Sequence, residues 1–156
     1  MSRRYVDALI QELRRRVSDY DGAWRTVYLG GGTPSTLAAD ELGRLFSAID
    51  CSSAREVTIE CNPDDVTADF VRQLSALPVN RVSMGAQTFD DDRLRFLRRR
   101  HKAADVAQAV ARLRDAGIAN ISVDLMYGFP GETLADWNHD IDEALALDVE
   151  HISAYC

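Results

Sequence analysis

Three consecutive glycines and a threonine, Gly30 to Thr33, follow the short apolar run "TVYL". A backbone without side chains offers its N–H and C=O groups to a ligand that must approach closely, and Pro34 restricts the chain where it leaves the turn. A structural bend is the simpler alternative, but one glycine would be sufficient for a bend. The triple glycine therefore favours close approach of a ligand.

Two well-known glycine-rich phosphate sites do not fit this stretch. A P-loop needs a Lys-Ser or Lys-Thr pair after its second glycine, and the sequence has no such pair here. The dinucleotide fingerprint G-x-G-x-x-G needs a final glycine where Ser35 stands. Both nucleotide interpretations are therefore disfavoured.

Polar side chains also stand at the ends of three later apolar runs, where Glu60 ends "VTIE", Asp124 follows "ISV" and Gln87 follows "SMGA". A buried carboxylate is costly unless a cation or hydrogen-bond donors neutralise it. For Glu60, a ligand with an ammonium group or ribose hydroxyls and an ion pair with Arg81 are both open. The same strand ends carry Asn62, Ser83 and Tyr127. Because parallel α/β proteins bind ligands beyond the carboxyl ends of their strands, we expect these polar residues to converge on one mouth.

Helical and β-rich patterns alternate along the chain and would position these residues. An apolar stripe through Tyr5, Leu9 and Leu13 predicts an initial helix. Further helices are expected over 39–49, 67–77, 103–116 and 134–147, and β-rich runs over 26–30, 55–63, 80–89, 121–131 and 151–156. Thr33, Thr67 and Thr133 are expected at helix starts. The alternation predicts one α/β domain over 1–156 with both sheet faces covered, while barrel and doubly wound sheet stay open.

Composition excludes several classes of protein. The chain has 156 residues and a net charge of −7, which disfavours nucleic-acid binding. No segment approaches the ~20 continuous apolar residues of a membrane span, and no signal peptide is recognisable, so a cytoplasmic location is expected. Cys51, Cys61 and Cys156 form no Cys-x-x-Cys pair, and the three histidines lack the spacing of metal ligands. No bound metal ion is therefore expected.

Five segments occur in a characteristic order: "YLGGGTPSTL", "IECNP", "NRVSMGAQTF", "LRRRH" and "VDLMYGFPGET". In this order they resemble the radical S-adenosylmethionine (SAM) proteins of the oxygen-independent coproporphyrinogen III oxidase family, most closely its heme chaperone (HemW) branch. The resemblance covers essentially the whole chain. It implies a parallel (β/α)6 partial barrel, incomplete here because the first strand would precede residue 1.

The resemblance also implies a set of SAM-binding residues. Arg99 is included because it matches a SAM-binding position and its guanidinium suits a carboxylate. Its neighbours Arg98 and Arg100 are expected on a solvated helix face. The full set implied is Gly30, Gly31, Gly32, Thr33, Glu60, Gln87, Arg99 and Asp124.

The family's chemistry is reductive cleavage of SAM by a [4Fe–4S] cluster held by a Cys-x3-Cys-x2-Cys loop. This sequence has no such loop, and alternation along the strand would turn Cys61 away from the mouth. The chain is therefore expected to be a fragment without the cluster-binding N-terminus and the C-terminal domain, inactive alone and without catalytic residues of its own. The edge of the "TVYL" strand would then be exposed, which is an aggregation liability.

Several functions follow from the resemblance as hypotheses. The first is a heme chaperone that binds SAM, carries heme and passes it to an acceptor protein. The second is oxidative decarboxylation of coproporphyrinogen III in porphyrin biosynthesis. A cluster-free, non-catalytic module belongs to another class. So does a metal-dependent barrel lyase that uses Glu60 and Asp124 as ligands, although this would leave the triple glycine unexplained.

Overall fold

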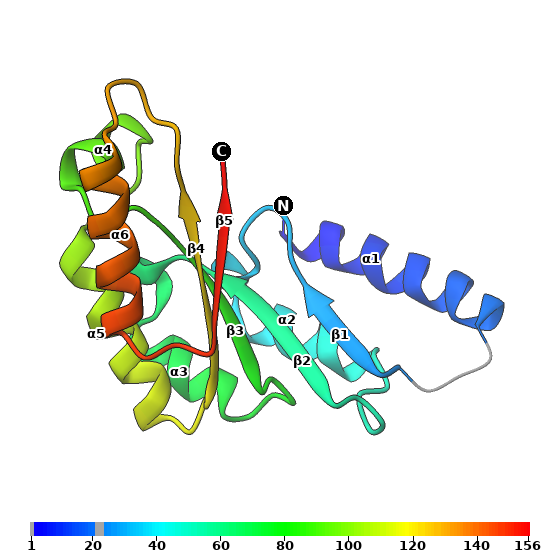
Figure 1. The fold of residues 1–156 in the computed structure, drawn as a ribbon. Helices are drawn as coiled ribbons and strands as arrows, with labels where there is room; N and C mark the ends of the chain where they lie inside the picture. Colours follow the sequence, from blue (N-terminus) through cyan, green and yellow to red (C-terminus); the bar gives the residue numbers. More distant parts are fainter. Residues whose placement is uncertain (1, 21–23) are drawn as a thin grey trace.

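A computed structural model describes residues 2–20 and 24–156. Its centre is one twisted sheet of five parallel strands in the spatial order β1-β2-β3-β4-β5 (Figure 1). The strands are β1 (Thr26–Leu29), β2 (Glu56–Cys61), β3 (Arg81–Gln87), β4 (Asn120–Met126) and β5 (His151–Tyr155). Because the spatial order follows the chain order without a reversal, the arrangement is that of a partial barrel and not of a doubly wound sheet.

Helices alternate with the strands and lie along one side of the sheet (Figure 1). They are α1 (Ser2–Arg16), α2 (Ala39–Ser47), α3 (Ala68–Leu74), α4 (Asp91–Phe96), α5 (Ala103–Asp115) and α6 (Leu134–Ala146). Three short 3-10 turns complete the elements: η1 (Val17–Asp19), η2 (Pro34–Thr36) and η3 (Pro63–Asp65).

One face of the sheet is apolar and packs against these helices. Ile59 of β2 and Val123 of β4 are fully buried in the same cluster as Leu42 of α2, Phe70 of α3 and Leu113 of α5. β-Branched strand residues alternate with polar ones, so each strand sends its apolar set to this face. The hydrophobic core therefore lies between the sheet and the outer helices.

The opposite face of the sheet is polar. It carries Thr58 and Glu60 from β2, Ser83 from β3, and Ser122 and Asp124 from β4, each placed one residue away from the apolar set. The expectation that helices cover both faces is wrong, because the described helices contribute to a single core on the apolar face. In barrel-type proteins the ligand sites lie where the carboxyl ends of the strands open on this inner side.

The sequence located most helices and their starts. Thr67 and Thr133 cap α3 and α6, with side chains that accept from the N–H groups of Phe70 and Asp136. Thr33 stands at the start of the 3-10 turn η2, as expected, but its side chain makes no capping bond and its φ is 72. The six-residue α4 was not expected, although Asp90 caps it.

The "TVYL" strand, β1, lies at an edge of the sheet and pairs within the described residues only with β2. Its expected place at an edge is confirmed for this part of the chain. None of the described helices combines the length and apolar character that a membrane crossing requires.

Candidate functional site

The carboxyl ends of the strands surround a cavity of about 250 Å³. It lies on the polar face, where parallel α/β proteins bind ligands. Six of the eight residues implied by the sequence line it: Gly32, Thr33, Glu60, Gln87, Arg99 and Asp124. The other two, Gly30 and Gly31, border an adjacent cavity of about 320 Å³ that shares Gly32 and Thr33. The glycine turn therefore separates two hollows.

The Glu60 carboxylate is held by two donors from β1 and the glycine turn. Tyr28 Oη donates to Oε1 over 2.6 Å, and the N–H of Gly31 donates to Oε2 over 2.9 Å. The alternative of an ion pair between Glu60 and Arg81 is wrong, because Arg81 Nη1 lies 4.0 Å from Glu56 Oε1 at the other end of β2. Both oxygens of Glu60 are thus fixed, and their remaining lone pairs can accept from a ligand.

Gly30 provides the space for this pair. A Cβ atom built on Gly30 would collide with the Tyr28 ring and lie 2.7 Å from Glu60 Oε1. The glycine is therefore required by the packing of Tyr28 and Glu60 across the end of β1. Partial burial is the main cause that raises the pKa of Tyr28 to about 12, and the hydrogen bond to Glu60 is the second. Tyr28 therefore remains a hydrogen-bond donor at physiological pH.

Gln87 and Arg99 meet above Gly85 at the end of β3. Arg99 Nη2 donates to the carbonyl of Gly85 over 2.7 Å, and a Cβ on Gly85 would lie 2.6 Å from Gln87 Nε2 and 2.7 Å from Arg99 Nη2. The strand register shifts between Met84 and Gln87, and Gln87 has φ 71. A left-handed conformation in a non-glycine residue is strained and is commonly retained at ligand sites.

Arg99 has an unsatisfied donor, because its Nε atom is buried without a hydrogen-bond partner among the described residues. Its neighbour His101 is buried and lies 3.1 Å, through Nε2, from the carbonyl of Ala86. Burial lowers the pKa of His101. His101 thus ties the "RRRH" segment to β3 as a neutral side chain. Arg98 and Arg100 are exposed as expected, but they lie between α4 and α5 and not on a helix face. Arg100 pairs with Asp64 and Asp65.

Asp124 faces the same cavity from β4. Ser83 Oγ lies 3.4 Å from its nearer carboxylate oxygen, which is a weak hydrogen bond. Burial raises the pKa of Asp124, and the Glu60 carboxylate adds to the rise. With Glu60, Asp124 and Arg99, the cavity wall holds two carboxylates and one guanidinium.

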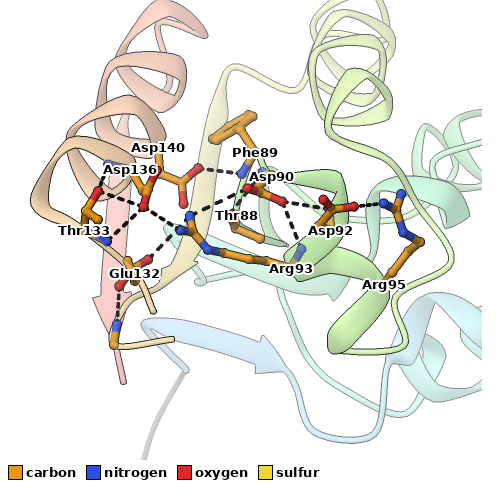
Figure 2. A network of polar contacts seen from close by, with 11 residues as sticks. Thr88, Phe89, Asp90, Asp92, Arg93, Arg95, Glu132, Thr133, Asp136 and Asp140 are labelled. Carbon is orange, nitrogen blue, oxygen red and sulfur yellow. Dashed lines mark hydrogen bonds and ion pairs between the residues drawn. The ribbon is translucent and has the colours of Figure 1, made fainter. Parts of the chain in front are cut away.

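A polar network joins the loop after β3 to the loop after β4 (Figure 2). Arg93 of α4, whose side chain is 16% exposed, bonds Asp136 of α6 over 2.9 Å. It also lies 3.8 Å from Glu132 and 5.8 Å from the centre of the Phe129 ring. Asp140, fully buried in α6, accepts from the N–H of Phe89 over 2.7 Å. These contacts fix α4, and the short segment after α4 carries Arg99.

Two tyrosines of this site were missed in the sequence. Tyr28 holds Glu60, and Tyr155 of β5 lines the cavity and donates to Gln87 Oε1 over 2.6 Å. The alternation of side chains along a strand could have revealed them, because each lies two residues from another residue of the polar face in the same strand. Tyr127, expected at the mouth, instead packs on Trp137 with ring centres 5.4 Å apart. Asn62 and Ser83 line the cavity as expected.

A larger hollow, of about 630 Å³, is lined by residues of α1 and α2. Arg44 in its wall is already neutralised, because it pairs with both Asp7 and Glu41. It contains none of the residues that the sequence singled out. The cavity at the strand ends is therefore the better candidate for a functional site.

The cysteines do not fit a [4Fe–4S] cluster. Cys61 lies in the hydrophobic core, Cys51 follows α2, and Cys156 follows β5. Burial raises the pKa of both the Cys61 and the Cys51 thiols, which opposes the thiolate form that iron requires. Among the described residues, no group of three or more His, Cys, Asp or Glu side chains could hold a metal ion. The lyase alternative with Glu60 and Asp124 thus lacks a third ligand there.

A sequentially ordered parallel sheet, with a glycine turn and charged residues at the carboxyl ends of its strands, is the architecture of a barrel-type α/β protein. The family model "Radical SAM superfamily" matches residues 1–144, and the chain belongs to this family. Radical SAM proteins use SAM and a [4Fe–4S] cluster. The resemblance stated from the five sequence segments is confirmed at the level of the family.

Two curated relatives are heme chaperones named HemW. The one from Bacillus subtilis (strain 168) is 41% identical over 157 residues, covering 97% of this chain and 41% of the relative. The one from Lactococcus lactis subsp. lactis (strain IL1403) is 37% identical over 155 residues, covering 97% of this chain and 40% of the relative. The chain therefore spans about two-fifths of the length of these relatives.

A solved structure shares the fold. Coproporphyrinogen III oxidase (HemN) from Escherichia coli, described as a radical SAM enzyme, matches with a TM-score of 0.86 and 27% identity. The match covers 99% of this chain and 37% of that chain. Five parallel strands with this likeness confirm the expected partial-barrel class.

Proposed function

We propose that residues 1–156 form one SAM-binding unit, with SAM in the cavity at the strand ends. This proposal rests on the match between the charged groups of SAM and those of the cavity wall. SAM has two positive groups, a sulfonium and an ammonium, and one carboxylate. The cavity offers the reverse, two carboxylates from Glu60 and Asp124 and one guanidinium from Arg99. Such complementarity favours the ligand and disfavours anions such as nucleoside phosphates.

Two further observations fit SAM at this place. The orphaned Nε of Arg99 is a buried donor in need of an acceptor, which a carboxylate would satisfy. Cβ atoms on Gly31 and Gly32 would meet nothing within 4 Å, so open space lies over the glycine turn. In the proposed arrangement Arg99 and Gln87 hold the ligand carboxylate, and Glu60 and Asp124 accept from its ammonium and hydroxyl groups. Gly31 to Thr33 allow close approach, and Gly30 makes room for the Tyr28–Glu60 pair.

SAM supplies a sulfonium whose carbon–sulfur bond can be cleaved reductively. A [4Fe–4S] cluster would supply the electron for this cleavage, and the cysteines of this chain do not fit one. We propose that the chain binds and orients SAM but does not turn it over alone. Anaerobic reconstitution with iron and sulfide, followed by assay for 5′-deoxyadenosine, tests this, and release of that product would contradict it.

For the biological role we propose heme handling as a heme chaperone that acts in the cytoplasm and passes heme to an acceptor protein. The names of the two curated relatives support this proposal. Oxidation of coproporphyrinogen III is the second candidate, because the HemN structure shares this fold. The test needs the full-length protein reconstituted with its cluster. Heme binding by that protein, seen as a Soret shift, without consumption of coproporphyrinogen III under anaerobic conditions, favours the chaperone role. Consumption of coproporphyrinogen III favours the oxidase.

Calorimetry with SAM and with S-adenosylhomocysteine tests the binding proposal directly. The two ligands differ by one methyl group and by the sulfonium charge, so a site with two carboxylates should bind SAM more tightly. Equal affinity for both would contradict the charge argument. Failure of a cooperatively folded protein to bind SAM at all would overturn the proposed function.

The raised pKa of Asp124 predicts how binding depends on pH. As the pH falls through this raised pKa, Asp124 gains a proton and loses its attraction for a cationic ligand, so SAM affinity should fall by about tenfold. Asp124→Asn should bind SAM about tenfold more weakly at neutral pH and lose this step in the pH profile. Calorimetric titrations between pH 4 and pH 8 measure both effects.

The stability of the folded protein should respond to Asp124 in the opposite direction. A carboxyl whose pKa is raised on folding stabilises the fold most at low pH, and this contribution is lost as the pH rises through the raised pKa. Asp124→Asn should remove that dependence as well. An unchanged pH profile of binding in Asp124→Asn would show that another group titrates.

A further inference from the structure

We propose that Tyr155 is a positioning residue that fixes which way the side-chain amide of Gln87 points. By donating to the amide oxygen, Tyr155 would keep the amide NH2 group beside Arg99 and available to a ligand carboxylate. This inference rests on the proposed binding of SAM at the cavity.

Tyr155 reaches Gln87 across an intervening strand. It lies on β5, whereas Gln87 ends β3, and β4 runs between them. Its hydroxyl donates to Gln87 Oε1 over 2.6 Å, and its backbone carbonyl accepts from the N–H of Tyr127 over 2.9 Å. The tyrosine is thus anchored at its backbone in the β4–β5 ladder and at its hydroxyl on β3.

The hydrogen bond from Tyr155 places the amide oxygen of Gln87 toward the tyrosine. O–H···O bonds centre near about 2.7 to 2.8 Å, whereas bonds from an N–H group centre near about 2.9 to 3.0 Å. A separation of 2.6 Å between Tyr155 Oη and Gln87 Oε1 therefore fits a hydroxyl that donates to a carbonyl oxygen. With the oxygen engaged by Tyr155, Nε2 is the side-chain atom of Gln87 that can donate to a ligand.

Arg99 makes the orientation of this amide important. Gln87 Nε2 and Arg99 Nη2 both lie within 2.7 Å of the Cβ position that Gly85 leaves vacant, so the two groups are neighbours. If the amide turned over, its oxygen would face the guanidinium and could accept from it. Arg99 would then be partly satisfied within the protein, and the paired donors suited to a carboxylate would be lost. Tyr155 opposes this reversal by holding the oxygen on the other side.

The backbone of Gln87 supports a fixed role for its side chain. Gln87 is 8% exposed, and it adopts φ 71 beside an irregularity in the β3–β4 register. Strain of this kind persists where the surroundings determine one conformation. A buried amide with a strained backbone and a single side-chain partner is therefore held by that partner.

The test compares SAM with decarboxylated SAM, which keeps the two positive groups but has no carboxylate. Tyr155→Phe keeps the ring and removes only the hydroxyl, so we expect SAM affinity to fall about tenfold while affinity for decarboxylated SAM is unchanged. Tyr127→Phe is the matched control, because Tyr127 is 42% exposed and Tyr155 is 43% exposed. It should change neither affinity. Equal weakening of both ligands by Tyr155→Phe, or no weakening, would overturn the proposal.

A double-mutant cycle separates positioning from packing. In a Gln87→Leu background there is no amide to orient, so adding Tyr155→Phe should have no further effect on SAM affinity. If the two changes are additive, Tyr155 acts independently of Gln87 and the inference is wrong.

A measurement without ligand separates this inference from the proposed function. Tyr155→Phe should shift the side-chain amide resonances of Gln87 in a ¹H–¹⁵N spectrum and leave those of Gln73 in α3 in place. A selective shift in a protein that does not bind SAM would overturn SAM binding but support the orientation of the amide. Unchanged Gln87 resonances would overturn the positioning role whether or not SAM binds.

Discussion

Gly85→Ala is expected to weaken SAM binding by about a hundredfold while the protein remains folded. The new Cβ would lie 2.6 Å from Gln87 Nε2 and 2.7 Å from Arg99 Nη2, so both side-chain ends must leave their places. Each polar contact to a charged ligand contributes about 1.5 kcal/mol, and losing two corresponds to about a hundredfold in Kd. Calorimetric titration with SAM measures the change.

The fold should tolerate this substitution because only the ends of two flexible side chains are displaced. Gly43→Ala is the matched control, since a Cβ there would meet nothing within 4 Å and Gly43 lies in α2. It should stabilise the protein by about 0.5 to 1 kcal/mol and leave SAM affinity unchanged. If Gly85→Ala bound SAM like the wild type, Gln87 and Arg99 could not be ligand contacts.

Local patterns in the sequence were sufficient for most of the fold. The apolar runs that ended in Glu60 and Asp124 became β2 and β4, and the Thr67 and Thr133 caps became helix starts. These features depend on neighbours in the chain. The expectation that helices cover both faces of the sheet was wrong. The alternation of residues along a strand does not indicate whether helices or a hollow lie against its polar side.

The sequence predicted the site residues that stand at strand ends. It did not predict the contacts that join one strand to another. Glu60 was located, and a ligand and Arg81 were both left open as its partner. The structure excludes Arg81, because strand register places it beside Glu56 and Thr58, and Tyr28 bonds Glu60 instead. The bond from Tyr155 to Gln87 depends on the order of three strands. The register and the order of the strands depend on the three-dimensional fold, and no local pattern in the sequence indicates them.

Arg93→Met is expected to lower the free energy of unfolding by about 3 kcal/mol. The change removes the guanidinium that lies 3.8 Å from the Oε1 atom of Glu132, a carboxylate whose side chain is only 7% exposed. That Oε1 atom already has no hydrogen-bond partner among the described residues, so it would become an uncompensated buried charge. Methionine keeps much of the aliphatic volume over Phe129, which limits the loss of packing. Urea unfolding followed by circular dichroism measures the change.

Arg95→Met on the same helix is the matched control (Figure 2). Arg95 is 71% exposed and pairs with Asp92, which is 81% exposed, so its loss should change stability by less than about 0.5 kcal/mol. The double variant Arg93→Met/Glu132→Gln should recover most of the lost stability, because an amide oxygen can still accept from the N–H of Gly128 without leaving a charge buried. If the double variant is no more stable than Arg93→Met, the loss arises from packing around Phe129 and not from the buried carboxylate. Since α4 leads directly into the segment that carries Arg99, we also expect Arg93→Met to weaken SAM binding and the double variant to restore it.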